Sequence, residues 1–420
     1  MTGTLEQANG ILKIVTGKFT RNYSTRPTLF NRANKGAGEK LGDRGFEIPT
    51  EIEGNWAHTW MTESGDYPAG RSVKTIRPTV FTKEYKHSVR LSMRAIETIK
   101  PGKTAVKDWY KENVDGSVAA AYKMNNIYAW GTGNGVIGTI SSGAASATQT
   151  LNNSNNVRYL RNGMLIEIWS SDYVTSRGTA RITSFPTPGT TTITLSASLT
   201  STTTDVVTIA GGANNAITGM DTIVDNVTDG PVIFQNTDRN EFLNYRGQVI
   251  DVDGAGIDTE ILQRMIGAKL EVALGGRGMG DEEGDNGFDY DGYELVSYMS
   301  QRDAYIGLGY NLRRFEGKTK SIDLGFTAHE FSGMPWIAEV DCRKDAVYYI
   351  DWSKVQKFVD ERGWHWVDID GTIMRLVPSE TTGRAFTAQA EGYFGCNWNL
   401  GSPDPRALGK VIDLAIPTSY

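Results

Sequence analysis

The chain has 420 residues, of which 39% are hydrophobic and 22% are charged, and its formal net charge at pH 7 is −6. These values are typical of a globular protein with room for two or three domains, each with its own core. No stretch approaches the roughly 18 consecutive apolar residues of a membrane span. The first residues also lack the apolar block of a secretory signal. We therefore expect a protein that stays in the cytosol where it is made and has no membrane partner.

The charge is unevenly distributed along the chain. Residues 71–111 hold eleven basic and three acidic residues, a net charge of +8, whereas residues 215–300 hold five basic and seventeen acidic residues, a net charge of −12. Either the two segments neutralise each other within one fold, or copies of the chain attract one another through them. The overall acidic excess argues against a dedicated nucleic-acid-binding protein. Two cysteines, Cys342 and Cys396, are too few for a disulfide framework.

The first 130 residues predict an arm, a ribbon and a helix. Residues 1–45 have no hydrophobic period and hold eight basic and three acidic residues, which indicates an arm that is disordered or laid over another part of the fold. Alternating apolar residues from Val73 to Met93 predict a long two-stranded ribbon within residues 46–98. Such a polar ribbon is poorly stable by itself. An apolar stripe at helical spacing predicts one helix over residues 103–130.

Residues 136–215 differ in kind from the segments on either side of them. Ser, Thr, Asn, Ala and Gly are abundant, and short strand patterns alternate with turn signals. We expect four or more strands, including residues 164–169, 178–185, 191–196 and 205–210. Together they predict a small β-barrel or sandwich inserted into a host domain.

Residues 216–420 return to a mixed α and β pattern. Helices are predicted from Asp258 to Gly275, from Tyr293 to Ile306 and from Ser353 to Glu361. Strands are predicted around the sequences IMRLV, AFTAQAEGYFGCNWNL and VIDLAI.

The passage FSGMPWIAEVDCRKDAVYYID, residues 331–351, is among the most aromatic in the chain and has no catalytic signature. Two apolar runs flank the charged residues 342–345, which predicts a β-hairpin with an exposed turn. The large aromatic residues of this passage are the predicted core of its lobe: Phe331, Trp336, Tyr348 and Tyr349.

Several fragments of catalytic or ligand-binding motifs fail when their context is considered. GNGVIG at residues 133–138 has the letters of a dinucleotide-binding turn but follows a helix instead of a strand, so we expect a hinge. The acidic run 281–292 does not fit a calcium loop at either end, and we expect a solvated loop, with weak metal binding left open. His329-Glu330 lacks the second histidine of a zinc protease motif. We therefore predict no catalytic residue, cofactor or metal.

The order of these pieces resembles the major capsid proteins of tailed bacteriophages, which have the Hong Kong 97 fold. The resemblance rests on WGTGNGVIG after the long helix, on residues 331–351 and on the ending AEGYFGCNWNLGSPDPRALGKVIDLA, and it covers the chain apart from residues 136–215. It implies an α+β fold with these parts: an N-terminal arm (1–45), an extended loop (46–98), a peripheral domain with a spine helix (99–131 and 371–420), an inserted β domain (136–215) and an axial domain (216–370).

The resemblance also implies a non-enzymatic structural protein of the virion, assembled in the cytoplasm of a bacterial host. Copies would form hexamers and pentamers of an icosahedral or prolate head shell around double-stranded DNA, and a procapsid would mature by conformational change. The implied partners are other copies, a scaffolding protein, a portal, a decoration protein and weakly contacted DNA. The candidate contacts between subunits are Arg71, Lys74, Arg77, Lys83, Lys86, Arg90, Asp281, Glu282, Glu283 and Asp285.

Two alternatives stay open. An encapsulin-like nanocompartment would share the fold but enclose no DNA. A carbohydrate-active enzyme with an inserted β module is the alternative from another class, because a pair of catalytic carboxylates leaves no local motif in a sequence. The missing secretory signal and the missing catalytic constellation argue against the enzyme, and the polar ribbon with its basic arm argues against any monomer.

Overall fold

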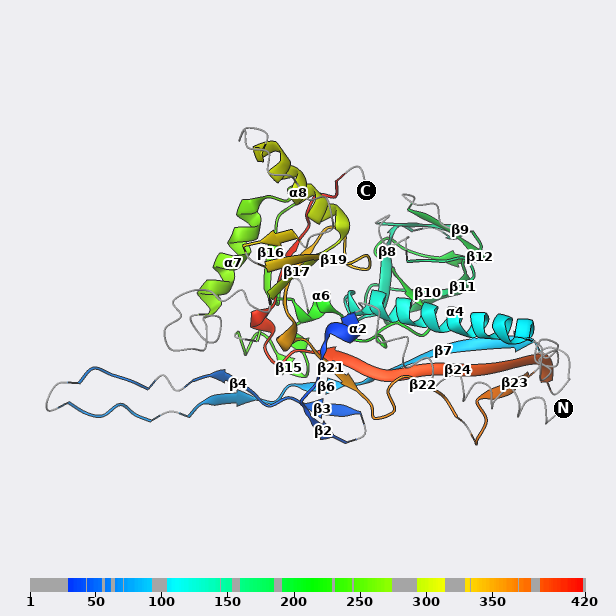
Figure 1. The fold of residues 1–420 in the computed structure, drawn as a ribbon, viewed down its shortest axis with the longest axis horizontal. Helices are drawn as coiled ribbons and strands as arrows, with labels where there is room; N and C mark the ends of the chain where they lie inside the picture. Colours follow the sequence, from blue (N-terminus) through cyan, green and yellow to red (C-terminus); the bar gives the residue numbers. More distant parts are fainter. Residues whose placement is uncertain are drawn as a thin grey trace.

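A computed structural model shows a body of sheets and helices from which one long hairpin projects (Figure 1). The described residues are 29–42, 44–54, 57–61, 65–70, 72–92, 104–143, 145–152, 159–184, 191–228, 231–243, 245–273, 293–313, 329–332, 334–368, 370–378 and 386–417. The described chain is mixed α+β, as the sequence predicts.

The long helix predicted over residues 103–130 is present as α4 (Thr104–Ala129). Among the described residues, no helix is long and apolar enough to cross a membrane. The other helical segments are α2 (Leu29–Arg32), α6 (Met220–Ile223), α7 (Thr259–Ala273), α8 (Met299–Arg313) and the 3-10 turns η1 (Trp352–Lys354) and η2 (Pro405–Ala407).

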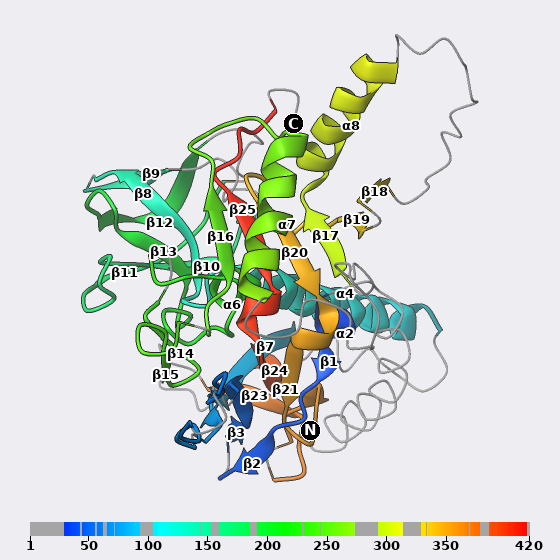
Figure 2. The same cartoon turned by 90° about the vertical axis from the view of Figure 1, so that its left-hand side faces the viewer.

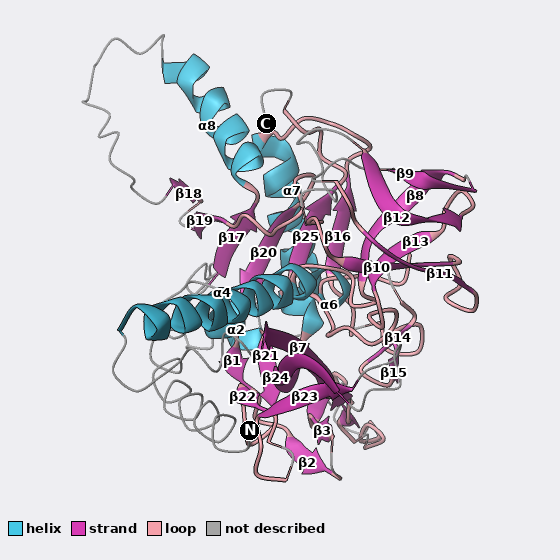
Figure 3. Cartoon of the chain, turned by 90° about the vertical axis from the view of Figure 1, so that its right-hand side faces the viewer, coloured by secondary structure: helices cyan, strands magenta, loops and turns pink. Residues whose placement is uncertain are grey.

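The longest strand, β24 (Phe386–Gly401), organises a six-stranded sheet. Its even-numbered residues from Ala390 to Leu400 are buried, which is the period of a strand with one face on a core. The helix α4 packs on this face through Val114 and Val118 (Figure 3). The strands that join β24 are β7 (Lys83–Ser92), β21 (Gln356–Val359), β22 (His365–Trp366) and β23 (Met374–Pro378), with β1 (Asn34–Lys35) beyond β21.

A second six-stranded sheet of mixed direction forms another lobe, with α7 and α8 beside it (Figure 2). Leu262 and Met265 of α7 pack with Leu295 and Tyr349 of this sheet. In spatial order its strands are β16 (Gln248–Asp251), β25 (Gly409–Ile412), β20 (Val347–Asp351), β17 (Tyr293–Ser297), β19 (Met334–Ala338) and β18 (His329–Phe331).

A third six-stranded sheet, which we call the 136–209 sheet, is antiparallel throughout and has its own core. Its two ends meet through a bridge between Ile182 and Leu195. The sequence analysis missed its first two strands because they are rich in Ser, Thr and Ala. In spatial order the strands are β11 (Ser176–Arg181), β10 (Leu165–Trp169), β13 (Val206–Ile209), β8 (Val136–Ser142), β9 (Ala145–Leu151) and β12 (Thr192–Thr200).

The remaining strands are short. Three of them form a small sheet at the base of the projecting hairpin, two form that hairpin, and two form a separate turn. They are β2 (Glu39–Leu41), β3 (Gly45–Glu47) and β6 (Thr79–Phe81); β4 (Thr50–Glu53) and β5 (Lys74–Ile76); and β14 (Ile233–Phe234) and β15 (Thr237–Asp238).

Three of the predicted elements are wrong. Residues 293–297 form the strand β17 and not the start of a helix, because they lie between β19 and β20 in the sheet and Leu295 and Val296 are buried there. Residues 353–361 contain η1 and the strand β21; Val355 and Phe358 are both buried, and their spacing imitated a helix. Residues 83–92 belong to the β24 sheet, so the free ribbon is limited to β4, β5 and the chain between them.

The predicted hairpin at residues 331–351 is also wrong. Its strands β19 and β20 do not pair, since β17 lies between them, parallel to β19 and antiparallel to β20. The turn at residues 342–345 is not exposed, because Cys342 is buried, residues 343–345 are half-buried, and Arg343 is held by the carboxylates of Asp221 and Asp345.

The end of the predicted arm lies over the body. Leu29 is 1% exposed and packs in the central core with Ala129, Trp130 and Trp398. The amide of Leu29 donates a hydrogen bond to the side chain of Asn126 on α4, at 3.1 Å. Residues 29–35 are therefore part of the folded body.

The chain crosses itself where it enters and leaves the 136–209 sheet. A Cβ atom on Gly219 would lie 1.8 Å from the carbonyl oxygen of Gly131, and one on Gly135, whose φ is +79°, would lie 2.2 Å from that of Gly212. Glycine is the residue that allows backbones to approach so closely. The GNGVIG sequence leads from this crossing into the strand β8, without the helix that a dinucleotide site requires.

We predict that Gly219→Ala lowers the free energy of unfolding by at least about 1–3 kcal/mol, because the new methyl group has no space. The matched control is Gly116→Ala on α4, where a Cβ meets no atom within 4 Å. Alanine there should raise the free energy of unfolding by up to about 1 kcal/mol. Chemical denaturation measures both, and equal effects would contradict the crossing.

Candidate functional site

The projecting hairpin carries large apolar side chains that are not buried against any of the described residues. Trp60 is 97% exposed and Tyr67 is 89% exposed. None of the described residues between β4 and β5 is buried. Two-stranded ribbons are marginal in water, and gathered apolar groups at a surface mark a contact with another molecule. The hairpin is therefore the strongest candidate for an interaction site in the described chain.

The basic residues predicted as contacts lie at the base of this hairpin and on β7, where each described one already has a neighbour. The pairs are Lys74 over the Phe242 ring (4.8 Å), Arg77 with Glu47 (3.6 Å), Lys83 with the carbonyl of Asn214 (3.2 Å), Lys86 with Glu84 (3.2 Å) and Arg90 with Glu391 (3.0 Å). Exposed ion pairs contribute about 0–1 kcal/mol, so carboxylates of another chain can replace these partners. Arg71, Asp281, Glu282, Glu283 and Asp285 lie outside the described residues.

The predicted core aromatics of residues 331–351 are all buried: Phe331 is 3% exposed, Trp336 2%, Tyr348 0% and Tyr349 1%. They do not share one core. Tyr348 packs in the central cluster with Trp130, and the other three pack beside α7. Tyr348 and Tyr349 differ because successive side chains of a strand point to opposite faces.

The carboxylate of Asp221 on α6 is buried and is bound by three side chains, one from β20, one from β25 and one from the turn before β20. Its oxygens accept hydrogen bonds from the Tyr348 hydroxyl at 3.0 Å, the Lys410 ammonium at 2.9 Å and the Arg343 guanidinium at 3.1 Å. The Lys410 side chain is also buried and lies 3.1 Å from Asp225. The sequence analysis missed this cluster, whose members are far apart in the chain; Lys410 within the apolar run GKVIDL was the available signal.

The pKa of the Asp221 carboxyl reflects two opposed effects. Burial raises it, but Arg343 and Lys410 outweigh burial, so the pKa lies below its ordinary value. Burial raises the pKa of Asp225, which has weaker cationic support. The stabilisation from Asp221 is therefore present above its unfolded pKa of about 3.9, and it is lost as the pH falls through the lower folded pKa.

We predict that Asp221→Asn lowers the free energy of unfolding at pH 7 by about 1–3 kcal/mol, because the buried Lys410 ammonium loses one of its two carboxylate partners and keeps only Asp225. The difference from the wild type should narrow below about pH 4, where the Asp221 carboxyl takes up a proton in the unfolded chain while it is still ionised in the folded protein. Asp370→Asn is the control, since the Asp370 side chain is 94% exposed beside Arg375. Urea denaturation from pH 3 to 7 checks this, and a difference that is independent of pH would contradict it.

Two cavities of similar size lie near α4. The first, of about 220 Å³, lies between the end of α4, β8 and residues 341–345, and its charged lining residues are Asp221, Asp341, Arg343, Lys344 and Asp345. The second, which we call the β7 cavity, has a volume of about 210 Å³ and lies between β7, α4 and the chain that leaves the 136–209 sheet. Its side-chain lining includes Lys83, Glu84, Tyr85, Lys86, Tyr128, Ile209 and Ile217.

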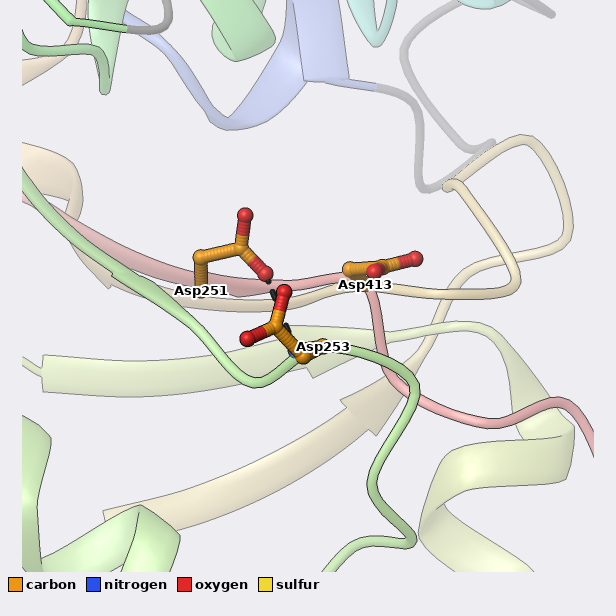
Figure 4. A group of neighbouring side chains, drawn as sticks. All are labelled: Asp251, Asp253 and Asp413. Atoms are coloured by element: carbon orange, nitrogen blue, oxygen red, sulfur yellow. Dashed lines mark hydrogen bonds between the residues drawn. The ribbon is translucent and has the colours of Figure 1, made fainter.

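Three carboxylates gather at the edge of the second sheet, those of Asp251, Asp253 and Asp413 (Figure 4). Their oxygens lie within 4.8 Å of one another, and all three residues are exposed. The amide of Asp253 donates a hydrogen bond to the Asp251 carboxylate at 3.1 Å. We assign no metal to this group, because exposed acidic residues alone do not mark a binding site.

No protein-family model matches the chain, and no curated protein matches its sequence. A chain of the Cyanophage A-1(L) capsid asymmetric unit aligns with a TM-score of 0.54 and 10% identity, covering 92% of this chain and 91% of that one. A capsid chain of a native GTA particle aligns over 92% and 90% of the two chains, with a TM-score of 0.42 and 10% identity. The likeness to the cyanophage chain shows that the described chain has an α+β fold of the kind found in a phage capsid, as the sequence resemblance implies.

Proposed function

We propose that this chain is the major capsid protein of a tailed bacteriophage, whose copies form the hexamers and pentamers of a head shell around double-stranded DNA. The observation that carries the proposal is the hairpin, with Trp60 and Tyr67 exposed on a ribbon that has no core. The fold likeness to a cyanophage capsid chain supports it over nearly the whole chain.

The hairpin favours contact with another copy because the described part of its own chain leaves Trp60 and Tyr67 exposed. A tryptophan or tyrosine side chain buries roughly 150–250 Å², which at about 25 cal/mol per Å² is roughly 4–6 kcal/mol before the costs of association. In a shell every copy has neighbours, so every hairpin can be covered. A monomer would leave this surface in water.

The parts of the fold take the following roles in the proposal. Residues 1–45 are the N-terminal arm and residues 46–98 the extended loop that contains the hairpin. α4 is the spine helix of a peripheral domain formed by residues 99–131 and 371–420, except that the strand β25 within this range joins the second sheet. Residues 136–215 are an inserted β-barrel domain, which the bridge between Ile182 and Leu195 supports. Residues 216–370 are the axial domain, with Phe331, Trp336 and Tyr349 in its core and Tyr348 in the central cluster with Trp130.

Charge assists assembly in this proposal. The basic residues at the hairpin base and on β7 face acidic residues of neighbouring copies, and steric fit sets the register of the contact. A scaffolding protein, a portal and a decoration protein are further proposed partners. Packaged DNA is contacted weakly through its phosphates. The role requires no catalytic group, cofactor or metal.

We predict that the wild-type chain, expressed with a scaffolding protein, forms shells, and that replacing residues 54–73 with a two-residue Asn-Gly turn abolishes them. The shortened chain should still fold, because β4 and β5 pair at the base of the hairpin. Electron microscopy and light scattering measure particles, and circular dichroism measures folding. A wild-type chain that stays monomeric would refute the proposal. Shells that form without DNA or a portal and enclose a protein cargo would instead favour a nanocompartment.

We predict that reversing Lys83, Lys86 and Arg90 together to Glu impairs shell assembly much more than it lowers the melting temperature. Within the chain, Lys86 and Arg90 form ion pairs that contribute about 1 kcal/mol or less each, and Lys83 donates one hydrogen bond to the Asn214 carbonyl. A matched control reverses three exposed basic residues that lie outside the β24 sheet: Arg161, Arg181 and Arg264. Normal particles from the β7 variant, or an equal loss in the control, would contradict the assembly role of these charges.

A further inference from the structure

We propose that the Trp60 side chain of one copy inserts into the β7 cavity of a neighbouring copy. The inference rests on the proposed function, which supplies the second copy, and it assigns their contact to one side chain and one cavity. It makes Trp60 the anchor of the hairpin.

Trp60 is the most exposed large apolar side chain of the described chain, at 97%. Tryptophan is also the residue most often found at the energetic centre of a protein interface, where it fills a pocket on the partner. Tyr67 lies on the other arm of the same hairpin and is 89% exposed. One hairpin therefore presents two aromatic rings, of which the indole is the larger.

The β7 cavity has the size and lining for an indole ring. Its volume is about 210 Å³, and an apolar cavity of about 150 Å³ admits benzene. Tyr85, Tyr128 and Ile217 supply apolar surface for the ring, and Lys83 and Lys86 lie in the same lining. A lysine ammonium over the face of a tryptophan is attracted by the ring, with a contribution of about 0.5–1 kcal/mol at an exposed site.

Charge distinguishes the two cavities. Residues 54–70 of the hairpin contain two acidic residues and no lysine or arginine. The lining of the β7 cavity holds two lysines and one glutamate, a net charge of 2 − 1 = +1. The lining of the other cavity holds three aspartates, one arginine and one lysine, a net charge of 2 − 3 = −1. The acidic hairpin therefore favours the β7 cavity.

On one chain, the hairpin extends away from the elements that line the β7 cavity. The hairpin extends from one side of the body, whereas α4 and the 136–209 sheet lie toward the other side (Figure 1). A hairpin therefore reaches the cavity of a different copy. Such a contact joins two different surfaces, and contacts of this kind close into rings when the rotation between copies permits. A hexamer or pentamer is such a ring.

The test places a photoreactive benzoylphenylalanine at position 60, where it preserves a large aromatic side chain. Shells are assembled from a mixture of isotopically light and heavy chains, irradiated, digested and analysed by mass spectrometry. We expect mixed light–heavy cross-links from position 60 to peptides that contain residues 83–86, 125–128 or 209–217. Shells whose cross-links fall elsewhere, including residues 341–345 of the other cavity, would overturn the inference while leaving the proposed function intact.

A second measurement uses the assembly threshold. Trp60→Ala should raise the chain concentration needed for half-maximal assembly by about tenfold or more, as expected for the loss of an interface anchor. Val174→Ala is the matched control, since Val174 is 76% exposed on the loop between β10 and β11 and should leave the threshold unchanged. A Trp60→Ala variant with the wild-type threshold would overturn the inference. Failure of the wild type to assemble would instead refute the proposed function, and the inference with it.

Discussion

The buried carboxylate of Asp221 is the interaction on which the arrangement of the body depends. It receives hydrogen bonds from a lysine of β25, a tyrosine of β20 and an arginine of the turn before β20. These three groups come from the lobe of the second sheet, and Asp221 itself lies just after the chain leaves the 136–209 sheet. A buried ion cluster of this kind holds its parts in one geometry, because any other geometry leaves a charge in the interior without a partner.

Because the body is held in one geometry, the hairpin that contacts another copy does not have to move. It only has to project from the body. The sheet of β24 carries β7, and the small sheet beside it carries the base of the hairpin, so both sides of the proposed contact are fixed to the same frame. The hairpin itself has apolar side chains but no core. Its stability is therefore tied to a partner, whereas the stability of the body is not. This division between a self-sufficient body and a dependent hairpin suits a subunit that must fold first and assemble afterwards.

The sequence predicted an element correctly where its apolar residues, repeated at regular spacing, all face a single core. α4 is the clearest case, since its stripe from Val114 to Ala121 faces the β24 sheet. Residues 293–297 were assigned to a helix because a strand buried on both faces has no alternation to show. Residues 331–351 looked like a hairpin because nothing in that passage reveals that β17, from elsewhere in the chain, separates its two strands.

The candidate site was predictable in part. The basic character of residues 71–111 was visible, but the sequence did not distinguish β7, which belongs to a sheet, from the free hairpin, since both alternate. Trp60 and Trp398 are the same residue type, yet one is 97% exposed and the other is buried in the central core. That difference depends on long-range packing, and it is what turns an aromatic residue from a core component into a candidate anchor.

The most direct test of the account is hydrogen–deuterium exchange of the hairpin backbone in the free subunit and in the assembled particle. We expect that amides of residues 57–61 and 65–70 exchange rapidly in the subunit and become protected on assembly, while those of β24 are protected in both. Hairpin amides that exchange rapidly in both states would show that no neighbouring copy covers the hairpin, and would contradict the central claim.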